Sequence, residues 1–419
     1  MTLTNASRTE GRLGRSDGAS PRGPLDGVRV LELGTLIAGP FTGRLLGDFG
    51  ADIVKVEAPS RGDPLRQWGA EGYHGQSLWW AVQSRNKRLI TLDLRTERGQ
   101  ELCRRLATES DVLLENFRPG TMERWSLGPA ELLELNPRLV YARVSGYGQT
   151  GPYAPRAGFA SAGEAMGGLR YLNGYPHEPP PRSGVSLGDS LAGMFAALGI
   201  VMALYHRDGR GGRGQVVDAS IMESCFAMLE SVVPEYDHLG MVRERGGTTL
   251  SNAAPSNIYR SRDNRWIVIA ANSDNLFDRL CSVMDREDLC QEERFADHRS
   301  RGENRDELDA IIGDWASQRD ATEIDAVLND NGVVCSPVYS VAEMFEDPHF
   351  RARELILRLE DPELGEIAAP GIVPKLSATP GHADTAGSWE TGAANLTVYR
   401  DWMGLTDDEI AGLATDGVI

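Results

Sequence analysis

The sequence is poor in the signatures of metal sites, disulfide scaffolds and nucleic-acid binding. Its 7 histidines are scattered and form no H-E-x-x-H or paired-ligand spacing, so no metal site is expected. Its 5 cysteines are odd in number, widely spaced and form no C-x-x-C pair, which indicates reduced thiols in a cytoplasmic protein. The net charge of −18 disfavours a nucleic-acid-binding surface and docking to anionic lipid.

A signal peptide and a membrane-spanning run are also missing from the sequence. The longest apolar run, Met194–Leu204, lies mid-chain and is short for a membrane span, so no membrane contact is expected. Residues 1–23 are polar, rich in Gly, Ser and Arg, and are expected to form a disordered arm. With 419 residues, 41% hydrophobic and 25% charged, the chain is expected to be globular and to form two domains.

Alternating strand and helix patterns in the first half predict a parallel sheet. The predicted strands are 28–33, 51–57, 89–94, 111–116 and 139–145, and the predicted helices among them are 41–49 and 97–110. This order is typical of a large α/β domain of the doubly wound, Rossmann-like type, which binds ligands at the carboxyl ends of its strands. Gly34, Gly39 and Gly43 do not spell G-x-G-x-x-G, which disfavours a nicotinamide site.

Changes in pattern along the chain predict the domain boundaries. The large domain is expected over 24–225, followed by a linker and a smaller α+β domain over 226–345 and a C-terminal return to the large domain over 346–419. The smaller domain has a clear strand at 265–271 and charged amphipathic helices between 275 and 331, whose charge runs are expected to be solvated faces.

One acidic residue stands directly before the most apolar stretch of the chain. Leu191–Tyr205 predicts a long helix buried on all sides and ending near Gly209. The preceding Asp189 fits an N-cap, because its oxygens can accept orphan backbone N–H groups and the helix dipole favours its charge. It also fits a carboxylate nucleophile that forms acyl-enzyme intermediates, with the adjacent Gly188 leaving room for a substrate. Local physics leaves both interpretations open.

A second candidate nucleophile, Ser186, lies in a G-x-S-x-G pattern at 184–188. A serine-hydrolase elbow requires a buried strand directly before the serine. The residues before it, 178–182, read EPPPR and cannot form a central strand. A hydrolase that uses Ser186 is therefore disfavoured.

Three stretches together resemble the class III CoA-transferase family, which includes formyl-CoA and carnitine CoA-transferases. They are PLDGVRVLELG from Pro24, the order GDS, apolar helix, YHRDGRGGRGQVVDAS over 188–220, and LTDDEIAGL near the C-terminus. The resemblance implies that Asp189 is the catalytic aspartate and that two copies of the chain interlock as a homodimer. It also implies a CoA thioester and a carboxylic acid as substrates, with no permanently bound cofactor.

The resemblance further implies where CoA binds. The turn matching Ile37 and Ala38 is expected next to the thioester, and Gly188 and Phe159 are expected near the substrate. The positions that match nucleotide and pantetheine contacts of the family are Leu92, Arg95, Asn116, Phe117 and Arg124. Further basic residues around the same strand ends favour phosphate contacts, namely Arg85, Lys87, Arg88 and Arg118.

The implied reaction is covalent transfer through Asp189. The carboxylate attacks the thioester to give a mixed anhydride and CoA thiolate, and the thiolate then converts the anhydride into an aspartyl-CoA thioester. Backbone N–H groups at the helix start and in the glycine turns are expected to stabilise the oxyanions. The alternatives are a 2-methylacyl-CoA racemase, disfavoured because Phe159 stands where racemases carry His, and a non-catalytic CoA-ester-binding protein.

Departures from the family pattern bear on the acyl group. Ala160 stands where many relatives have Asp, Ile37 stands where formyl-type members have Gln, and Ala393 and Ala394 replace an E-H pair. The glycine run of formyl-type members is also missing near 245–248. An apolar wall disfavours a small dianion such as oxalate. A larger acid with an apolar body, held by an arginine such as Arg156 or Arg243, is expected instead.

Overall fold

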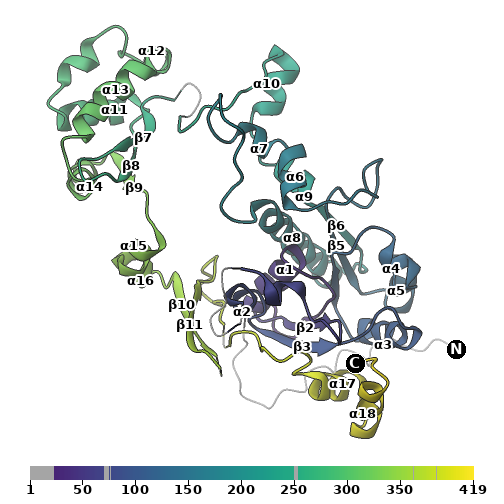
Figure 1. Ribbon diagram of the computed structural model, residues 1–419. Coiled ribbons are helices and arrows are strands. Elements are labelled where there is room, and N and C mark those ends of the chain that lie inside the picture. Colours follow the sequence, from purple (N-terminus) through teal and green to yellow (C-terminus); the bar gives the residue numbers. More distant parts are fainter. Residues whose placement is uncertain (1–22, 70–74, 76, 250–252, 362, 384) are drawn as a thin grey trace. The chain divides into compact units, whose positions relative to one another are not determined.

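The computed structural model describes residues 23–69, 75, 77–249, 253–361, 363–383 and 385–419. The arm expected at 1–23 lies outside these residues except for Gly23. The chain divides into two compact units (Figure 1). Unit 1 takes its residues from Met1–Leu169, Ser183–Glu230 and Arg353–Ile419, and unit 2 consists of Arg170–Arg182 and Ser231–Ala352.

Unit 1 is built on a six-stranded parallel sheet. Its strands are β1 (Arg29–Glu32), β2 (Asp52–Glu57), β3 (Lys87–Thr91), β4 (Val112–Glu115), β5 (Val140–Ser145) and β6 (Val216–Ser220). They follow the spatial order β3-β2-β1-β4-β5-β6, with every pair parallel. This arrangement confirms the predicted α/β class with a doubly wound sheet. The strand order reverses between β1 and β4, which makes the carboxyl ends of these two strands the expected ligand-binding crevice.

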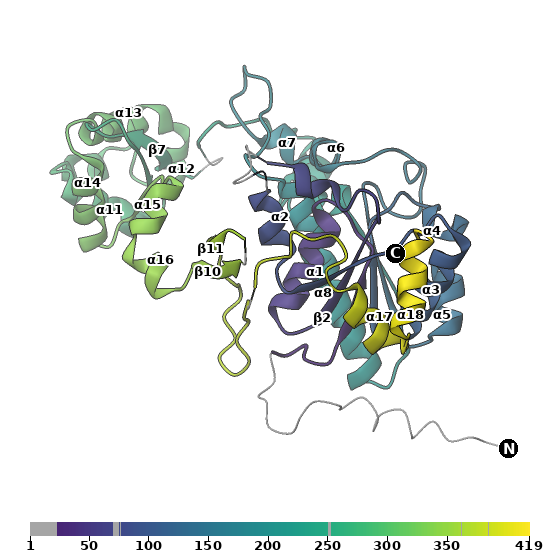
Figure 2. The same cartoon turned by 60° about the horizontal axis from the view of Figure 1, so that its bottom comes forward.

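Helices cover both faces of this sheet, because alternate strand residues point to opposite faces (Figure 2). On β1, Val30 packs with α1 and α8, whereas Leu31 packs with α3 and α17. The first face carries α1 (Ala38–Asp48), α8 (Leu187–Gly209) and α9 (Ile221–Phe226). The second carries α3 (Glu97–Thr108), α5 (Pro129–Leu135), α17 (Asn395–Met403) and α18 (Asp407–Thr415).

The C-terminal segment of unit 1 is tied to the edge of the same sheet. The Tyr399 hydroxyl donates to the carbonyl of Thr91 at 2.7 Å, and the Asn395 side chain bonds Thr91 as well. The antiparallel pair β10 and β11 precedes α17. The remaining elements of this unit are η1 (Pro64–Gln67), α2 (Leu78–Gln83), α4 (Thr121–Arg124), α6 (Ala160–Met166), β10 (Ile356–Asp361) and β11 (Gly365–Pro370).

Unit 2 has an antiparallel sheet of order β7-β8-β9, formed by Ser256–Arg260, Trp266–Ala270 and Val334–Pro337. Apolar faces of its helices close a separate core around Phe277, Leu308 and Trp315. Those helices are α11 (Asp274–Val283), η2 (Glu287–Gln291), α12 (His298–Glu303), α13 (Arg305–Ala316) and α14 (Ala321–Asp330). Shorter helices outside this core are α7 (Leu169–Leu172), α10 (Val232–Leu239), α15 (Val341–Glu346) and α16 (Pro348–Ala352).

The long helix α8 is only half buried, so the expectation of burial on all sides was wrong. Its sheet-facing side is made of small residues such as Ala192, Ala196 and Ala203, which allow a close approach to the sheet and α1. The large apolar residues point outward, namely Met194, Leu198, Val201, Met202 and Tyr205, each more than 40% exposed. By length and composition α8 could also cross a membrane, with a mean hydropathy of 1.8. The expectation that the apolar run is too short for a membrane span was therefore wrong. A core helix of a soluble protein passes the same test.

Candidate active site at the start of helices α1 and α8

Asp189 lies in the first turn of α8 but does not occupy the cap position. The N-cap residue is Ser186, whose side chain makes no capping hydrogen bond. Instead the Gly188 N–H donates to Oε1 of Glu164 at 3.0 Å, and Glu164 is only 5% exposed. A carboxylate from α6 therefore satisfies the helix terminus, and the N-cap interpretation of Asp189 is wrong. Glu164 was missed because a cap donated by a different helix leaves no local sequence pattern.

Gly188 is where α8 packs against its neighbours. A Cβ atom on this residue would lie 3.0 Å from Cγ2 of Ile221 and 3.1 Å from Cγ of Glu164. The absence of a Cβ atom at Gly188 therefore allows the helices to pack. The Gly188 N–H is already bonded to Glu164, and the Leu187 N–H is bonded to the Val185 carbonyl. These two amides of α8 are not free to bind an oxyanion, contrary to the expectation for the helix start.

A buried thiol completes the surroundings of Asp189. Burial, together with the nearby carboxylates of Glu164 and Asp189, raises the pKa of Cys225 to about 11. Cys225 therefore stays a neutral thiol at physiological pH and is inert. All five cysteines are free, as the sequence indicated.

The turn between β1 and α1 is fixed by side chains from other parts of unit 1. Asn116 accepts from the Thr35 N–H and donates to the Thr35 carbonyl, both at 2.8 Å. The Leu36 N–H donates to Oδ1 of Asp63 at 3.1 Å, with Leu36 at a φ of 63°. In the described part of the chain, the N–H groups of Ile37, Ala38 and Gly39 have no hydrogen-bond acceptor. Such amides at a helix N-terminus favour an anionic group.

Helices α1 and α8 lie side by side on the same face of the sheet (Figure 1). The Thr42 hydroxyl of α1 donates to the Gly193 carbonyl of α8 at 3.2 Å. A Cβ on Gly193 would lie 3.0 Å from the Ala38 carbonyl oxygen. Asp189 precedes Gly193 by four residues, which is about 6 Å along a helix axis. Asp189 and the free amides of α1 therefore stand at the same edge of the sheet, beside the crevice between β1 and β4.

Three of the basic residues expected to bind phosphate form ion pairs within unit 1. Arg85, 1% exposed, forms an ion pair with Asp48 and donates to the Pro370 carbonyl at 2.8 Å. Lys87 is buried against Glu32 at 2.7 Å, whereas Arg88 pairs with Asp52 and stays 31% exposed. The expectation of phosphate contacts was wrong for Arg85 and Lys87, because both are buried and held by carboxylates on neighbouring elements.

The loop and short helix after β4 carry basic groups that remain accessible. Arg118 and Arg124 are exposed and have no carboxylate partner among the described residues, although Arg124 donates to Oγ1 of Thr121 at 3.0 Å. The residues that flank this pair in the sequence, Phe117 and Trp125, pack their rings edge to face, with centroids 5.3 Å apart. Since this loop follows the carboxyl end of β4, its arginines lie where a phosphate-bearing ligand is expected.

The other expected contacts are dispersed. Arg95 is 62% exposed and pairs with Asp93 at 2.8 Å. The Leu92 side chain lies in the hydrophobic core, which leaves only its backbone for a ligand. Phe159 is 66% exposed at the start of α6, the helix that carries Glu164.

The two arginines considered for the acceptor differ in their partners. Arg156 stacks on Tyr153 at 3.6 Å and has no carboxylate partner among the described residues. Arg243, in unit 2, is held by Glu235, with one hydrogen bond of 3.0 Å. Arg156 is therefore the better candidate for binding a carboxylate.

Hydrolase and metal chemistry find no support in the described residues. Ser186 begins α8 without a preceding strand, so the strand-to-helix elbow of a serine hydrolase is not formed. Among the residues described, no group of three or more His, Cys, Asp or Glu side chains could hold a metal ion.

Comparisons with known proteins identify the family of the chain. A family model described as CoA-transferase family III matches residues 25–387. The chain is 51% identical over 399 residues to a succinyl-CoA–D-citramalate CoA-transferase of Chloroflexus aurantiacus, covering 95% of this chain and 99% of that protein. It is 39% identical to the β subunit of a succinyl-CoA–L-malate CoA-transferase of the same organism, covering 96% and 100%. Among solved structures, a CAIB/BAIF family protein from Brucella suis matches with a TM-score of 0.81 and 32% identity, covering 91% of this chain and 100% of that one.

Proposed function

Because this chain belongs to CoA-transferase family III and is a CoA-transferase acting on CoA thioesters, we propose that it transfers CoA from succinyl-CoA to a short hydroxydicarboxylate such as citramalate or malate. The names of its relatives support this choice of donor and acceptor. The observation that carries the mechanism is the placement of Asp189 beside the open amides of α1, at the reversal point of the sheet.

Asp189 acts as the nucleophile of the transfer. Its carboxylate oxygen attacks the thioester carbonyl, the C–S bond breaks, and CoA thiolate leaves a mixed anhydride on the enzyme. The thiolate then attacks the aspartyl carbonyl, which releases the donor acid as its carboxylate and leaves an aspartyl-CoA thioester. The acceptor carboxylate repeats the two steps in reverse order and regenerates Asp189. Each step exchanges groups of similar energy, which is the advantage of the covalent route.

The open amides of Ile37, Ala38 and Gly39 stabilise the oxyanions formed in these steps. Each attack on a carbonyl places negative charge on its oxygen, and backbone N–H groups aimed at that position lower the barrier. The amides at the start of α8 cannot serve, since Glu164 and the Val185 carbonyl already accept from them. No resident cofactor enters these steps.

The accessible arginines after β4 bind the CoA phosphates. Arg118 and Arg124 lack carboxylate partners in the described chain, and guanidinium groups bind phosphate with paired donors. Arg95 contributes less, because Asp93 competes for its guanidinium.

An apolar wall and a cation select the acceptor. The exposed Phe159 supplies apolar surface, and Arg156 supplies the charge for the distal carboxylate of a dicarboxylic acid. The Ile37 side chain is buried in a hydrophobic core and does not contribute to this wall. An acid that has both an apolar body and a second carboxylate fits this combination. Oxalate, which lacks the apolar body, fits it poorly.

The test is a comparison of donors with one acceptor. We expect kcat/KM for succinyl-CoA with citramalate or malate to exceed kcat/KM for formyl-CoA with the same acid. Chromatography of the CoA esters measures both rates. A clear preference for formyl-CoA would refute the donor assignment and leave the role of Asp189 standing. Absence of transfer with every donor would refute the mechanism as well.

We also propose that the enzyme is a cytoplasmic homodimer. The outward face of α8 exposes large apolar side chains over about three turns, including Met194, Leu198 and Met202. An exposed apolar patch of this kind marks an interaction surface, and a second copy of the chain is the partner that the family resemblance implies. Sedimentation equilibrium should give twice the chain mass of 45.7 kDa, and a monomer at micromolar concentration would contradict this proposal.

A further inference from the structure

A neutral cluster of four buried charges lies beneath the turn between β1 and α1. It consists of Glu32 at the end of β1, Lys55 on β2, Lys87 on β3 and Asp63 in the loop before η1. The side chains of Glu32, Lys55 and Lys87 are fully buried, and Asp63 is 1% exposed. Buried charges are costly to maintain unless they are paired and hydrogen-bonded, so a cluster of this size requires an explanation.

Three members of the cluster bond the backbone of the turn. Lys55 Nζ donates to the Gly34 carbonyl at 2.6 Å and lies 2.8 Å from Oδ2 of Asp63. The other oxygen of Asp63 accepts from the Leu36 N–H at 3.1 Å. Lys87 Nζ donates to the Pro40 carbonyl at 2.7 Å. The turn is thus anchored on both sides of Ile37, Ala38 and Gly39.

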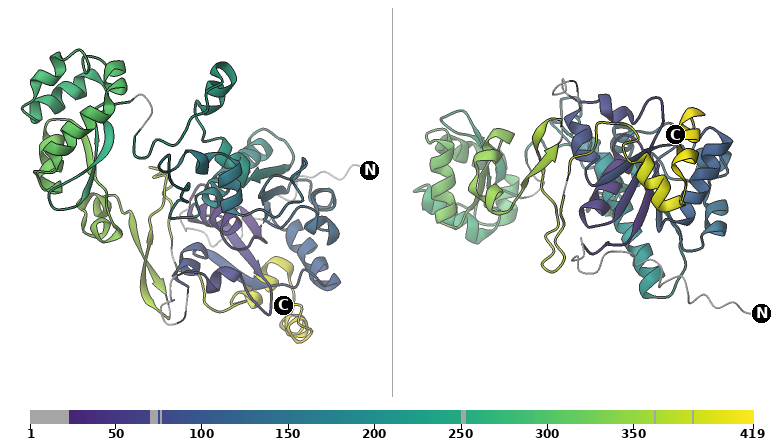
Figure 3. Two further views of the ribbon diagram at one scale, coloured as in Figure 1. Left: turned by 45° about the horizontal axis from the view of Figure 1, so that its top comes forward. Right: turned by 90° about the horizontal axis from the view of Figure 1, so that it is seen from below.

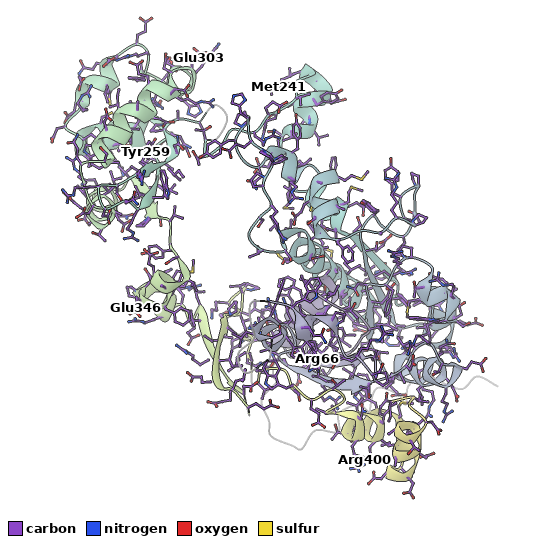
Figure 4. All side chains as sticks on the ribbon, viewed as in Figure 1. Arg66, Met241, Tyr259, Glu303, Glu346 and Arg400 are labelled. Carbon is purple, nitrogen blue, oxygen red and sulfur yellow. The ribbon has the colours of Figure 1, made fainter. Side chains whose placement is uncertain are left out.

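A further pair of side chains supports Asp63 from behind. The Asp63 N–H donates to Oε1 of Glu57 at 2.8 Å, and Glu57 pairs with Arg66 at 2.7 Å. Arg66, labelled in Figure 4, stacks on Trp80 at 4.0 Å and donates to the Trp389 carbonyl at 2.7 Å. Packing on a large aromatic ring and several hydrogen bonds therefore limit the movement of Asp63.

The turn needs this support because its conformation is strained. Leu36 has a φ of 63°, in the left-handed region that non-glycine residues seldom adopt. Such a conformation persists only where the surrounding structure determines it, and it is typical of functional sites. Lys55 retains its charge there: burial lowers its pKa, but the carboxylates of Asp63 and Glu32 more than compensate and raise it.

We propose that Lys55 and Asp63 are positioning residues for CoA transfer, which hold Leu36 in its left-handed conformation and thereby aim the amides of Ile37, Ala38 and Gly39 at the thioester oxygen. This inference rests on the proposed function. Neither residue contacts the substrate, and both act through the backbone that they anchor. Their loss should therefore affect the chemical step and leave CoA binding nearly unchanged.

The principal test compares Lys55→Met with Arg85→Met. Both substitutions remove a buried cation from an ion pair near α1, but Arg85 pairs with Asp48 at the opposite end of that helix and makes no contact with the turn. We expect Lys55→Met to lower kcat by about 10²-fold with KM for the acyl-CoA changed less than about threefold, because oxyanion donors act in the transition state. Arg85→Met should keep kcat near the wild-type value at temperatures where it is folded.

Asp63→Asn provides a second variant in case Lys55→Met does not fold. It preserves the size of the side chain and an acceptor for the Leu36 N–H but places an amide or an uncharged oxygen opposite Lys55. We expect the same split, a fall in kcat with KM nearly unchanged, in a protein with native circular dichroism. If Asp63→Asn retains wild-type kcat, or if Arg85→Met loses as much kcat as the turn variants, the positioning role is refuted.

The proposed function fails separately from this inference. All variants are assayed with whichever acyl-CoA donor the wild-type enzyme prefers. If the wild-type enzyme does not use succinyl-CoA as a donor, the donor assignment is refuted. If kcat is unchanged in Lys55→Met and Asp63→Asn, the role of Lys55 and Asp63 is refuted.

Discussion

Replacing Asp189 by Asn should separate activity from stability. In the structure, the Gly188 N–H of α8 is bonded to Glu164 and not to Asp189, so the usual cost of losing a cap does not apply. Asp189→Asn keeps the size of the side chain and removes its charge, and the interaction of one carboxylate with the first turn of a helix is worth about 0.3–1 kcal/mol. The free energy of unfolding should therefore change by less than about 1 kcal/mol.

Glu164→Ala is the matched comparison, because it removes the acceptor of a buried N–H. An unsatisfied buried donor costs about 1–3 kcal/mol, so Glu164→Ala should destabilise the protein more than Asp189→Asn does. Activity should follow the opposite order. Asp189→Asn should lower kcat by at least about 10³-fold, because the covalent route is lost.

Urea unfolding followed by circular dichroism measures the first quantity, and CoA transfer measures the second. Intact-mass analysis after incubation with acyl-CoA should show a CoA adduct on the wild-type chain and none on Asp189→Asn. A severely destabilised Asp189→Asn protein beside a normal Glu164→Ala protein would show that Asp189 caps the helix after all. Transfer at near wild-type rate in Asp189→Asn would refute its role as nucleophile.

Three further predictions follow from the charges and glycines of unit 1. Arg124→Ala should raise KM for acyl-CoA by about tenfold or more, the equivalent of one charge-assisted hydrogen bond, with a smaller effect on the acceptor; equal effects on both substrates would contradict phosphate binding. Gly188→Ala should destabilise the protein by about 1–3 kcal/mol in urea unfolding, because the new Cβ would press on Ile221 and Glu164; an unchanged midpoint would show that α8 shifts freely. Burial lowers the pKa of Lys87 to about 8, although the Glu32 carboxylate opposes the shift. In the unfolded chain the pKa of this lysine is near 10.4, so between pH 8 and that value the unfolded chain holds a proton that the folded protein has released. Wild-type stability should therefore rise with pH across that window relative to Lys87→Met, by up to about 3 kcal/mol, and a pH-independent difference between the two proteins would refute the shift.

The fold could be predicted because its signals are local and repeated. Each strand of the large sheet is a short apolar run, and the helix between 97 and 110 has its cap in Thr96 and an amphipathic pattern in its own residues. The two-sided cover of the sheet follows from strands that are apolar on both faces. By contrast, the exposure of one side of α8 could not be predicted, since Leu198 and Met202 are as apolar as residues of a core. A surface for a partner and a buried surface have the same composition in a sequence.

The sequence indicates one part of the candidate site, Asp189, whose role as nucleophile stays a prediction. Asp189 stands in a motif, and a motif is visible in the linear sequence. Contacts between distant segments are not, such as those of the C-terminal helices (yellow in Figure 3) with the first strands of unit 1 (purple and blue). Glu164 belongs to another helix and accepts a hydrogen bond from the N–H of Gly188, the residue before Asp189. Its role depends on a tertiary contact 24 residues away in sequence, for which no spacing rule exists.

The basic residues show most clearly that tertiary contacts limit prediction from the sequence. Whether a basic residue can bind a ligand depends on whether a carboxylate of the protein already pairs with it. Arg85, Lys87, Arg118 and Arg124 are equivalent in the sequence, where each is a cation near the end of a strand. In the structure, Asp48 and Glu32 neutralise the first two inside the protein, whereas the last two meet no carboxylate among the described residues. An acidic protein of net charge −18 that leaves arginines unpaired at the carboxyl edge of its sheet has a use for them there. Since Asp189 and the free amides of α1 share that edge, the unpaired arginines are best explained by a polyanionic substrate, which is what CoA is.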